Sequence, residues 1–312
     1  MIEANQPALF PAGALSADSS LQAALGAFEK HLTEEGFAEY TRRAYTSDIR
    51  LLGKYLGIGQ PIGEIGTKNL NDFLHWLLYE RGVPCSQKSY ARRVTSLKAF
   101  FGWLAESGVL ASNAADAVVQ ISVTSPLPSL PTEREIQRAL EITSALRQGS
   151  DGDQPDARPH LLLTLLLRTG IKKGETTSLV LNHVDRDAAD GPMLFIRYKN
   201  PRQRHKERKI PLDHDWLEVL DEYIEQYAPA DTIFTCTARN LEYILSDVAE
   251  SAGLEKGALS FENLRWVSAL RDYRQEVEPQ EIRRKLGLSP VTWRETKNKI
   301  ERLEAQQRTG DL

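Results

Sequence analysis

The residues best suited to chemistry lie in three stretches of the carboxyl-terminal half, and many of them are cationic. Residues 169–185 have the sequence TGIKKGETTSLVLNHVD, and residues 260–300 contain the patterns L-R-x-x-x-A-L and L-G-x-S. Between them, residues 197–209 hold seven Lys or Arg and one His against a single acidic residue, Glu207. Lys and Arg are the side chains that proteins use to bind phosphate. The basic cluster at residues 197–209 therefore predicts a surface that faces nucleic-acid phosphates, with a merely solvated basic face as the alternative.

In order and spacing the stretches resemble motifs of the tyrosine recombinases, the family of the phage integrases and Xer proteins. The pattern T-G-[apolar]-basic-x-G-E-x-x-x-L-x-x-x-x-V-D resembles the family's first arginine motif, and the other two patterns resemble its carboxyl-terminal signature. The resemblance covers about residues 21–300. It implies a reaction in which a tyrosine forms a phosphotyrosine link to DNA. Two arginines and a histidine neutralise the phosphate, and a hairpin lysine protonates the leaving oxygen.

The chain departs from the family at most of the positions that do this chemistry. The family-equivalent positions are Lys172, Lys199, Glu262, Arg265, Leu288 and Lys297. Only Arg265 keeps the family's residue at a phosphate-binding arginine position, and Lys199 matches the hairpin lysine, with Lys206 as a weaker substitute. Lys172 retains the charge of the first arginine but loses its planar, bidentate fork. The resemblance therefore implies a fold whose catalytic set is not intact.

The two histidine positions and the nucleophile position are the largest departures. Glu262 places an acceptor where the phosphate needs a donor, and Leu288 offers no polar group. Lys297 stands where the nucleophilic tyrosine is expected. Each lost transition-state donor costs on the order of 2.7–4 kcal/mol, so several together predict loss of cleavage.

Other residues could in principle supply the nucleophile. No tyrosine follows Tyr273, which is only eight residues after Arg265 and far from the family spacing. Ser289, Thr292 and Thr296 are near the expected position, but a hydroxyl is harder to ionise than a phenol, and no histidine follows His214. A divergent active recombinase with an atypical nucleophile stays open as the alternative.

Apolar residues at helical spacing predict four helices with short connections in the amino-terminal part, starting near Ser20, Glu39, Thr67 and Ser86. Arginine and lysine pairs lie on these helices and are expected to face outward onto DNA phosphates. With the hairpin and Arg265, the predicted DNA contacts are Arg42, Arg43, Lys88, Arg92, Arg93, Lys199, Arg202, Arg204 and Arg265.

The fold class that follows is mainly α with a small β-hairpin or sheet, in two domains. Residues 1–18 are expected to be a disordered leader, and residues 19–121 a helical bundle. The resemblance identifies this bundle with the family's SAM-like core-binding domain. Residues 122–131, SVTSPLPSLP, predict a linker because three prolines prevent a helix. Residues 132–312 are expected to form the domain of the tyrosine-recombinase catalytic type, beginning with a helix capped by Thr132 and Glu135. Strands are predicted at residues 193–198, 207–211 and 232–234.

Composition and charge restrict the classes of protein to which the chain could belong. The formal net charge is −4, which is unusual for a DNA-binding protein, but the basic residues are clustered and the acidic ones lie elsewhere. Two distant cysteines, Cys85 and Cys236, predict neither a disulfide framework nor a zinc site. We expect no cofactor and no metal. Without a membrane-length apolar run or a signal-like amino terminus, a cytoplasmic, nucleoid-associated location is expected.

Two hypotheses about function remain, with a third behind them. The residues favour a DNA-binding protein that does not cleave and acts as an accessory or regulatory factor in DNA recombination or integration. The alternatives are the divergent recombinase and a protein-interaction relic of the fold. Double-stranded DNA is the expected partner. In residues 290–308 the stripe Trp293, Thr296, Ile300 and Leu303 predicts docking on its own domain, with self-association or binding of an active recombinase as the alternative.

Overall fold

The structure is a computed structural model that describes residues 15–119, 127–149 and 154–310. Most of the expected leader and the first half of the expected linker lie outside the described residues. The chain divides into two compact units between Pro126 and Leu127. Both are mainly helical, and the second contains a small antiparallel sheet, so the predicted fold class is confirmed.

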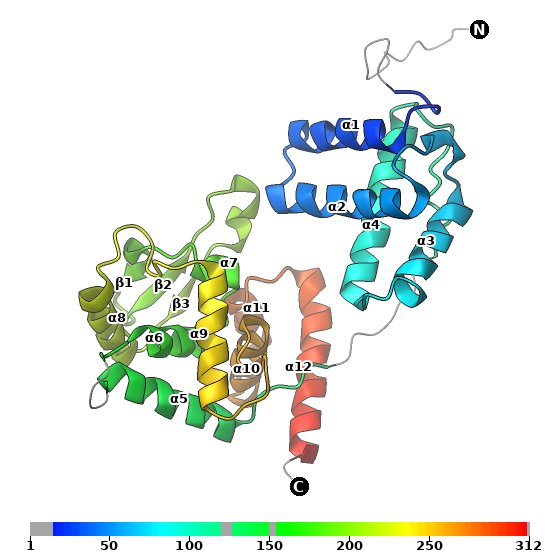
Figure 1. Ribbon diagram of the computed structural model, residues 1–312. Helices are drawn as coiled ribbons and strands as arrows, with labels where there is room; N and C mark the ends of the chain where they lie inside the picture. Colours follow the sequence, from blue (N-terminus) through cyan, green and yellow to red (C-terminus); the bar gives the residue numbers. More distant parts are fainter. Residues whose placement is uncertain (1–14, 120–126, 150–153, 311–312) are drawn as a thin grey trace. The chain divides into compact units, whose positions relative to one another are not determined.

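The amino-terminal unit is built from helices whose apolar faces meet in one core (Figure 1). Its elements are α1 (Leu21–Glu34), α2 (Glu39–Leu56), the 3-10 turn η1 (Ile62–Glu64), α3 (Thr67–Tyr79) and α4 (Gln87–Glu106). Ser20 and Ser86 cap α1 and α4, since each hydroxyl accepts a bond from a backbone N–H of the first turn. Thr67 is the first helical residue rather than a cap, and its hydroxyl donates to the carbonyl of Ala114. The predicted bundle is therefore present, with one start shifted.

A buried carboxylate joins α2 to α4. Asp48 accepts hydrogen bonds from Arg92 Nη1 at 2.7 Å and from Ser96 Oγ at 2.8 Å, and Arg93 Nε lies 3.7 Å from its second oxygen. The side chain of Asp48 is 4% exposed and that of Arg93 is 12% exposed. The prediction that Arg93 faces solvent is wrong, because a carboxylate buried on the neighbouring helix requires a positive partner.

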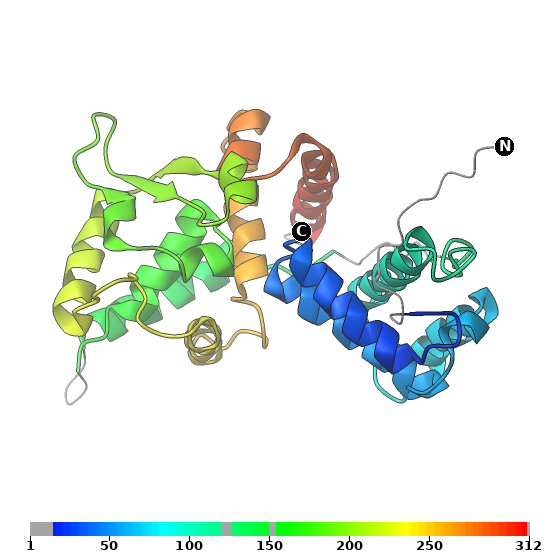
Figure 2. The same ribbon diagram turned by 90° about the horizontal axis from the view of Figure 1, so that it is seen from above.

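The carboxyl-terminal unit is arranged around one leucine-rich helix, α6 (Arg158–Thr169), which is buried among its neighbours. The helices are α5 (Glu133–Gln148), α6, α7 (Lys173–Thr176), α8 (His214–Tyr227), α9 (Ala238–Ser251), α10 (Phe261–Arg274), α11 (Pro279–Lys285) and α12 (Pro290–Gly310). Thr132 and Glu135 form the predicted capping box at the start of α5. Seen from above, α10 stands between α6 and α12 (Figure 2).

The sheet has the order β1-β2-β3, with β1 (Val184–Asp185), β2 (Met193–Ile196) and β3 (Arg208–Pro211), all antiparallel. The predicted hairpin is β2–β3, in the register Met193 opposite Pro211 and Ile196 opposite Arg208. Its connection contains a 3-10 turn, η3 (Pro201–Lys206). The strand predicted at residues 232–234 is wrong, because only Thr232 makes an isolated bridge, to Val180. The two-residue β1 and a 3-10 turn η2 (Leu181–His183) were not predicted.

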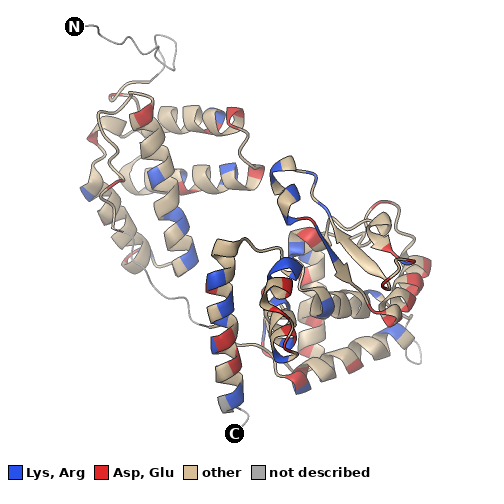
Figure 3. Ribbon diagram, turned by 180° about the vertical axis from the view of Figure 1, so that it is seen from behind, with Lys and Arg blue, Asp and Glu red and all other residues tan. Residues whose placement is uncertain are grey.

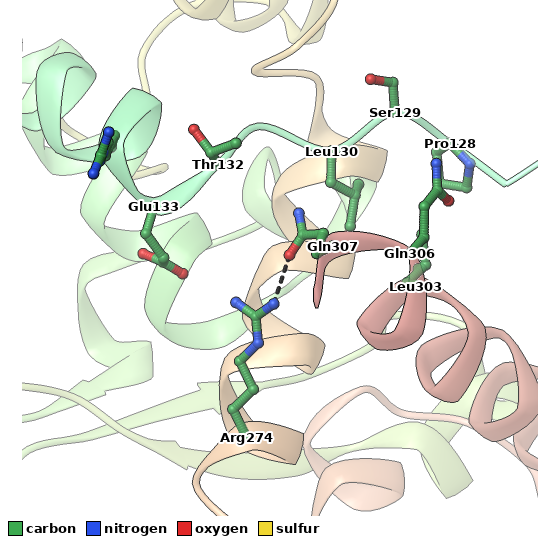
Figure 4. A pocket seen from close by; sticks show the side chains of 10 residues that line it. Pro128, Ser129, Leu130, Thr132, Glu133, Arg274, Leu303, Gln306 and Gln307 are labelled. Atoms are coloured by element: carbon green, nitrogen blue, oxygen red, sulfur yellow. Dashed lines mark hydrogen bonds between the residues drawn. The ribbon is translucent and has the colours of Figure 1, made fainter. Parts of the chain in front are cut away.

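The last helix, α12, packs on its own unit. Trp293 and Ile300 are buried in an apolar cluster with residues of α10 and α11, and Leu303 is also buried. Arg274 of α10 pairs with Glu304, and its Nη2 donates to Gln307 Oε1 at 2.7 Å (Figure 4). Beside this contact, residues 128–130, the start of α5 and the end of α12 line a cavity of about 760 Å³. The expected docking on its own domain is what the structure contains.

The Asp48 cluster generates the first prediction. Replacing Asp48→Ala leaves the mostly buried guanidinium of Arg93 without a carboxylate, so the free energy of unfolding should fall by on the order of 3 kcal/mol. Urea titrations of the full chain, followed by circular dichroism, measure this. Glu39→Ala removes only the exposed partner of Arg43 and should cost less than about 1 kcal/mol. Equal effects of the two changes would contradict the role given to Asp48.

Candidate phosphate site and nucleic-acid interface

At the centre of the candidate site lies a buried ion pair between Glu175 and Arg208. Glu175 belongs to the short helix α7, and Arg208 begins β3. The guanidinium donates two parallel hydrogen bonds, each 2.9 Å long, to the two carboxylate oxygens. The Arg208 and Glu175 side chains are 7% and 3% exposed. Tyr198, at the end of the β2 side of the hairpin, donates its hydroxyl hydrogen to Glu175. One carboxylate thus fixes both sides of the hairpin to the first motif.

Protonation of this cluster is set by the ion pair. Burial alone would raise the pKa of Glu175, but the hydrogen bonds and charge of Arg208, with the N–H of Lys172 and the Tyr198 hydroxyl, lower that pKa to about 2. Burial and the neighbouring Glu175 raise the pKa of the Tyr198 phenol to about 12. Tyr198 is therefore held as a neutral hydrogen-bond donor.

Arg265 ties the carboxyl-terminal motifs to the first one. It donates from Nη1 to the carbonyl of Gly170 and from Nη2 to the carbonyl of Leu286. These carbonyls end α6 and α11, whose last C=O groups have no partner inside the helix. Burial, as the main cause, lowers the pKa of Arg265 to about 10, so the group stays charged at neutral pH.

Two glycines of the motifs are required by this packing. Gly170 has a φ of +57°, and a Cβ there would lie 3.2 Å from Ser268 of α10. Gly287 has a φ of +59°, and a Cβ there would lie 2.8 Å from Arg208 Nη1. Both angles lie in the left-handed region that favours glycine. The T-G and L-G patterns thus mark two positions where the backbone lies next to an arginine. The carbonyl of Gly170 accepts from Arg265, and Gly287 lies against Arg208.

Lys172 and Lys206 lie beside this cluster. Partial burial of the ammonium group lowers the pKa of Lys172, and the positive charges of Arg265, Lys206 and Arg208 lower it further, while Glu175 opposes the shift. Lys206 is half-buried, and its carbonyl accepts a bond from Arg208 Nη1 at 3.2 Å. Lys199 is exposed. The structure thus brings Lys172, Arg265 and Lys206 together, a concentration of positive charge that suits an anion.

The three remaining family-equivalent positions have other surroundings. Glu262 is exposed in the first turn of α10. Leu288 is half-buried against the apolar cluster of α10, α11 and α12. Lys297 lies on α12, where its ammonium is 3.8 Å from Glu301. None of the three has a phenol that could attack phosphorus as a tyrosine does.

The hydroxyl groups near Lys297 take part in helix structure. Ser289 Oγ accepts a bond from the N–H of Thr292 and lies 3.0 Å from the Thr292 hydroxyl. Thr296 Oγ1 donates to the carbonyl of Thr292 at 2.9 Å. Tyr273 is half-buried and packs against the apolar cluster under α12.

The connection between β2 and β3 carries several Lys and Arg residues, which are blue in Figure 3. Lys199, Arg202 and Arg204 are exposed, and within the residues that the structure describes none has a carboxylate oxygen within 4.0 Å. Asn200 orders the segment by accepting a bond from the N–H of Arg202. Exposed cations without acidic partners can bind phosphates without first breaking an ion pair.

The predicted cations of the amino-terminal unit differ in their availability. Arg43 and Lys88 are exposed, and Arg43 pairs with Glu39. Arg42 is half-buried and donates to Thr33 Oγ1 at 2.7 Å. Arg92 is bound to Asp48 and to the carbonyl of Ala44. Contact of these residues with DNA stays a prediction.

Sequence reasoning missed Arg208 and Tyr198 as members of the site. Arg208 was counted only as one charge of a basic run. The strand register could have identified Arg208 as a buried residue. Arg208 lies opposite Ile196, on the strand face that carries the buried Ile210. A charged residue on a core face needs a buried partner, and the only acidic residue of the first motif before Asp185 is Glu175.

A pH titration tests the ion pair. Since the pKa of Glu175 is lowered from 4.5 to about 2, its contribution is complete above the unfolded-state pKa and is lost as the pH falls toward 2. Between pH 5 and 2 this should remove roughly 3 kcal/mol of unfolding free energy. Urea titrations at several pH values should show a smaller loss over that range in Glu175→Gln. The same pH dependence in both proteins would contradict the assignment.

The described residues contain no helix long and apolar enough to cross a membrane. Across those same ranges, no three His, Cys, Asp or Glu side chains are grouped in a way that could hold a metal ion.

Comparison with known proteins places this geometry in a family. The model of the phage integrase N-terminal SAM-like domain matches residues 25–108. The tyrosine recombinase XerC of Mycobacterium sp. (strain JLS) is 28% identical over 211 residues, which are 67% of each chain. XerD of Listeria innocua is 25% identical over 240 residues, 72% of this chain and 76% of the relative.

Solved structures share the fold. XerH recombinase bound to a palindromic difH substrate superposes with a TM-score of 0.71 at 15% identity, covering 96% of this chain and 99% of that one. A lambda integrase dimer bound to a COC′ core site gives a TM-score of 0.68 at 20% identity, covering 89% and 77%. The matched domain, the similarity to curated relatives across most of the chain, and the convergence of the motif residues lead to one assignment. The chain belongs to the tyrosine recombinase family.

Proposed function

We propose that this protein binds double-stranded DNA and acts in DNA recombination without itself forming a covalent bond to DNA. The observation that carries the proposal is the contrast within one site. Lys172, Lys206 and Arg265 are gathered around a fixed frame, while Lys297 occupies the position of the expected tyrosine. The relatives named tyrosine recombinase and the neighbours solved on DNA support the DNA-binding part.

The groups that are present support the proposed loss of covalent chemistry. A tyrosine recombinase needs a phenol free to attack phosphorus, together with donors for the charge that develops on the phosphate. Tyr198 is bound to Glu175 with a pKa raised to about 12, and Tyr273 packs against an apolar cluster. Ser289, Thr292 and Thr296 are engaged in helix capping or bonding. No observation favours a divergent nucleophile.

Within this proposal, Lys206 rather than Lys199 is the hairpin lysine of the phosphate site. Its carbonyl is held by Arg208, and its charge acts on Lys172. Lys199, Arg202 and Arg204 then serve as contacts to the DNA backbone beyond the site, together with Arg43 and Lys88 of the amino-terminal unit. Such contacts give affinity and position rather than sequence recognition.

The role that fits a binding protein of this family is accessory or regulatory. It would act in the cytoplasm, associated with the nucleoid. There it would occupy a recombination site beside an active recombinase or in competition with one. Association with another copy or with that recombinase through α12 is part of the proposal. It would require α12 to leave the cluster in which Trp293 and Ile300 are buried.

A nicked suicide substrate tests the absence of cleavage. Incubation with a recombination-site duplex carrying a nick beside the cleavage position should give no protein–DNA band that survives SDS, because the nucleophile is lacking. An intact tyrosine recombinase on the same substrate is the control that shows trapping to work. A stable covalent band from this chain would overturn the proposal and favour the divergent enzyme.

Salt dependence tests the DNA interface. Affinity for duplex DNA should fall steeply between 50 and 200 mM salt, as expected when several phosphates are neutralised. Replacing Lys199, Arg202 and Arg204 together by Ala should lower the slope of log Kd against log salt by roughly 2.7, about 0.9 for each lost phosphate contact.

The matched control replaces three exposed cations of the same unit, Lys256, Arg294 and Arg302, by Ala. It removes the same total charge and should leave the slope nearly unchanged. If both triple variants lowered the slope equally, general charge and not the hairpin segment would account for binding. Absence of DNA binding at low salt would leave only the protein-interaction hypothesis.

A further inference from the structure

A second charged cavity lies in the carboxyl-terminal unit, outside the phosphate site. Its volume is about 340 Å³, and it is formed by the end of α6, strand β3, the end of α10 and helix α11. The charged residues that line it are Arg168, Lys209, Asp272, Glu281, Arg284 and Lys285. Four cations against two carboxylates leave two positive charges in excess.

Part of this charge is already neutralised inside the protein. Lys285 Nζ lies 2.9 Å and 2.7 Å from the two oxygens of Asp272, and these side chains are 18% and 15% exposed. Arg168 donates to the carbonyl of Pro211 and lies 3.5 Å from Asp213. The Lys285–Asp272 pair is a fixed part of the wall, since largely buried partners hold each other in place, whereas the Arg168–Asp213 pair is exposed.

The two cations left over are Lys209 and Arg284. Among the residues that the structure describes, neither has a carboxylate oxygen within 4.0 Å. Lys209 Nζ lies 4.8 Å from the centre of the Phe195 ring, and Arg284 Nε donates to the carbonyl of Gln280. Most of their donors thus remain available to a ligand. An ammonium and a guanidinium together can bind a phosphate group through charge-assisted hydrogen bonds.

This cavity is distinct from the phosphate site, although they share elements. Arg208 donates to Glu175, whereas Lys209, the next residue of β3, lines this cavity. Lys285 likewise lines the cavity with its side chain, whereas its carbonyl accepts the hydrogen bond of Arg208 Nε at 2.7 Å. A ligand here would meet none of Lys172, Lys206 or Arg265, which are absent from the lining.

The rest of the lining determines the chemical class of the ligand. Ile210 and Ile282 are buried residues of the wall, joined by Pro211 and Val277. Small-molecule sites in proteins have volumes of roughly 300–1,000 Å³ and combine apolar walls with a few polar groups. After these pairs, Lys209 and Arg284 face one remaining carboxylate, Glu281. The net positive charge that is left matches a phosphate group, and the apolar wall matches an organic body attached to it. We propose that this cavity binds a small organic phosphate of the nucleoside-monophosphate class.

Calorimetric titration of the full chain with adenosine 5′-monophosphate tests the proposal. The expected result is saturable binding of one equivalent, weakened at least about tenfold by Lys209→Ala and by Arg284→Ala, since each loses a hydrogen bond to a charged group. Arg294→Ala, an exposed arginine of α12 outside the cavity, is the matched control and should bind as the unmodified protein does. Adenosine, which lacks the phosphate, should not bind.

Three results would overturn the proposal. These are absence of binding of the monophosphate up to millimolar concentration, equal weakening by all three substitutions, and equal binding of adenosine. Duplex DNA titrated against the same variants separates the two sources of phosphate. Unchanged DNA affinity in Lys209→Ala and Arg284→Ala supports a small-molecule site. Loss of DNA affinity without monophosphate binding would make the cavity a contact for the DNA backbone instead. Because the two ligands are measured separately, this proposal and the proposed DNA function can fail independently.

Discussion

The structure of the site depends on burying one carboxylate against one guanidinium. Removing Glu175 and Arg208 from water is costly, and only a bidentate pair with further hydrogen bonds offsets that cost. Arg208 meets this requirement by donating to Glu175, to the carbonyl of Lys285 and to that of Lys206. One side chain therefore connects α7, α11 and the hairpin, which come from distant parts of the sequence. Arg265 adds its bonds to the ends of α6 and α11.

In the proposed function, this frame separates the residues that would bind a phosphate from the positions that would carry out its chemistry. The charges of Lys172, Lys206 and Arg265 are gathered by backbone and ion-pair contacts that do not involve the positions of the family's histidines or its tyrosine. Glu262 lies in an exposed turn, Leu288 packs against an apolar cluster and Lys297 is half-buried on α12. Changes at these positions therefore need not disturb the frame. The proposed function rests on this separation, with the fold and the affinity for DNA kept and strand cleavage lost.

The sequence was informative where local signals act alone. Apolar periodicity with the caps Ser20, Ser86 and Thr132 predicted the helices closely, and alternation predicted the hairpin strands. The sequence did not predict the burial of side chains whose positions depend on partners far away in the chain. Arginine side chains usually face solvent, so the sequence predicts Arg93 and Arg208 at the surface, whereas pairing with Asp48 and Glu175 holds both in largely buried positions. The two-residue strand β1 is too short to carry a periodic signal, and residues 232–234 resembled a strand but have only one bridging partner.

The most direct measurement of the central claim is a crystal structure of the full chain bound to a duplex recombination site. The account predicts a backbone phosphate within hydrogen-bond distance of Lys172 and Arg265, with the DNA strand continuous and unattached beside Lys297. A strand broken at that phosphate and joined covalently to any side chain would contradict it. So would a complex in which no phosphate approaches Lys172 and Arg265.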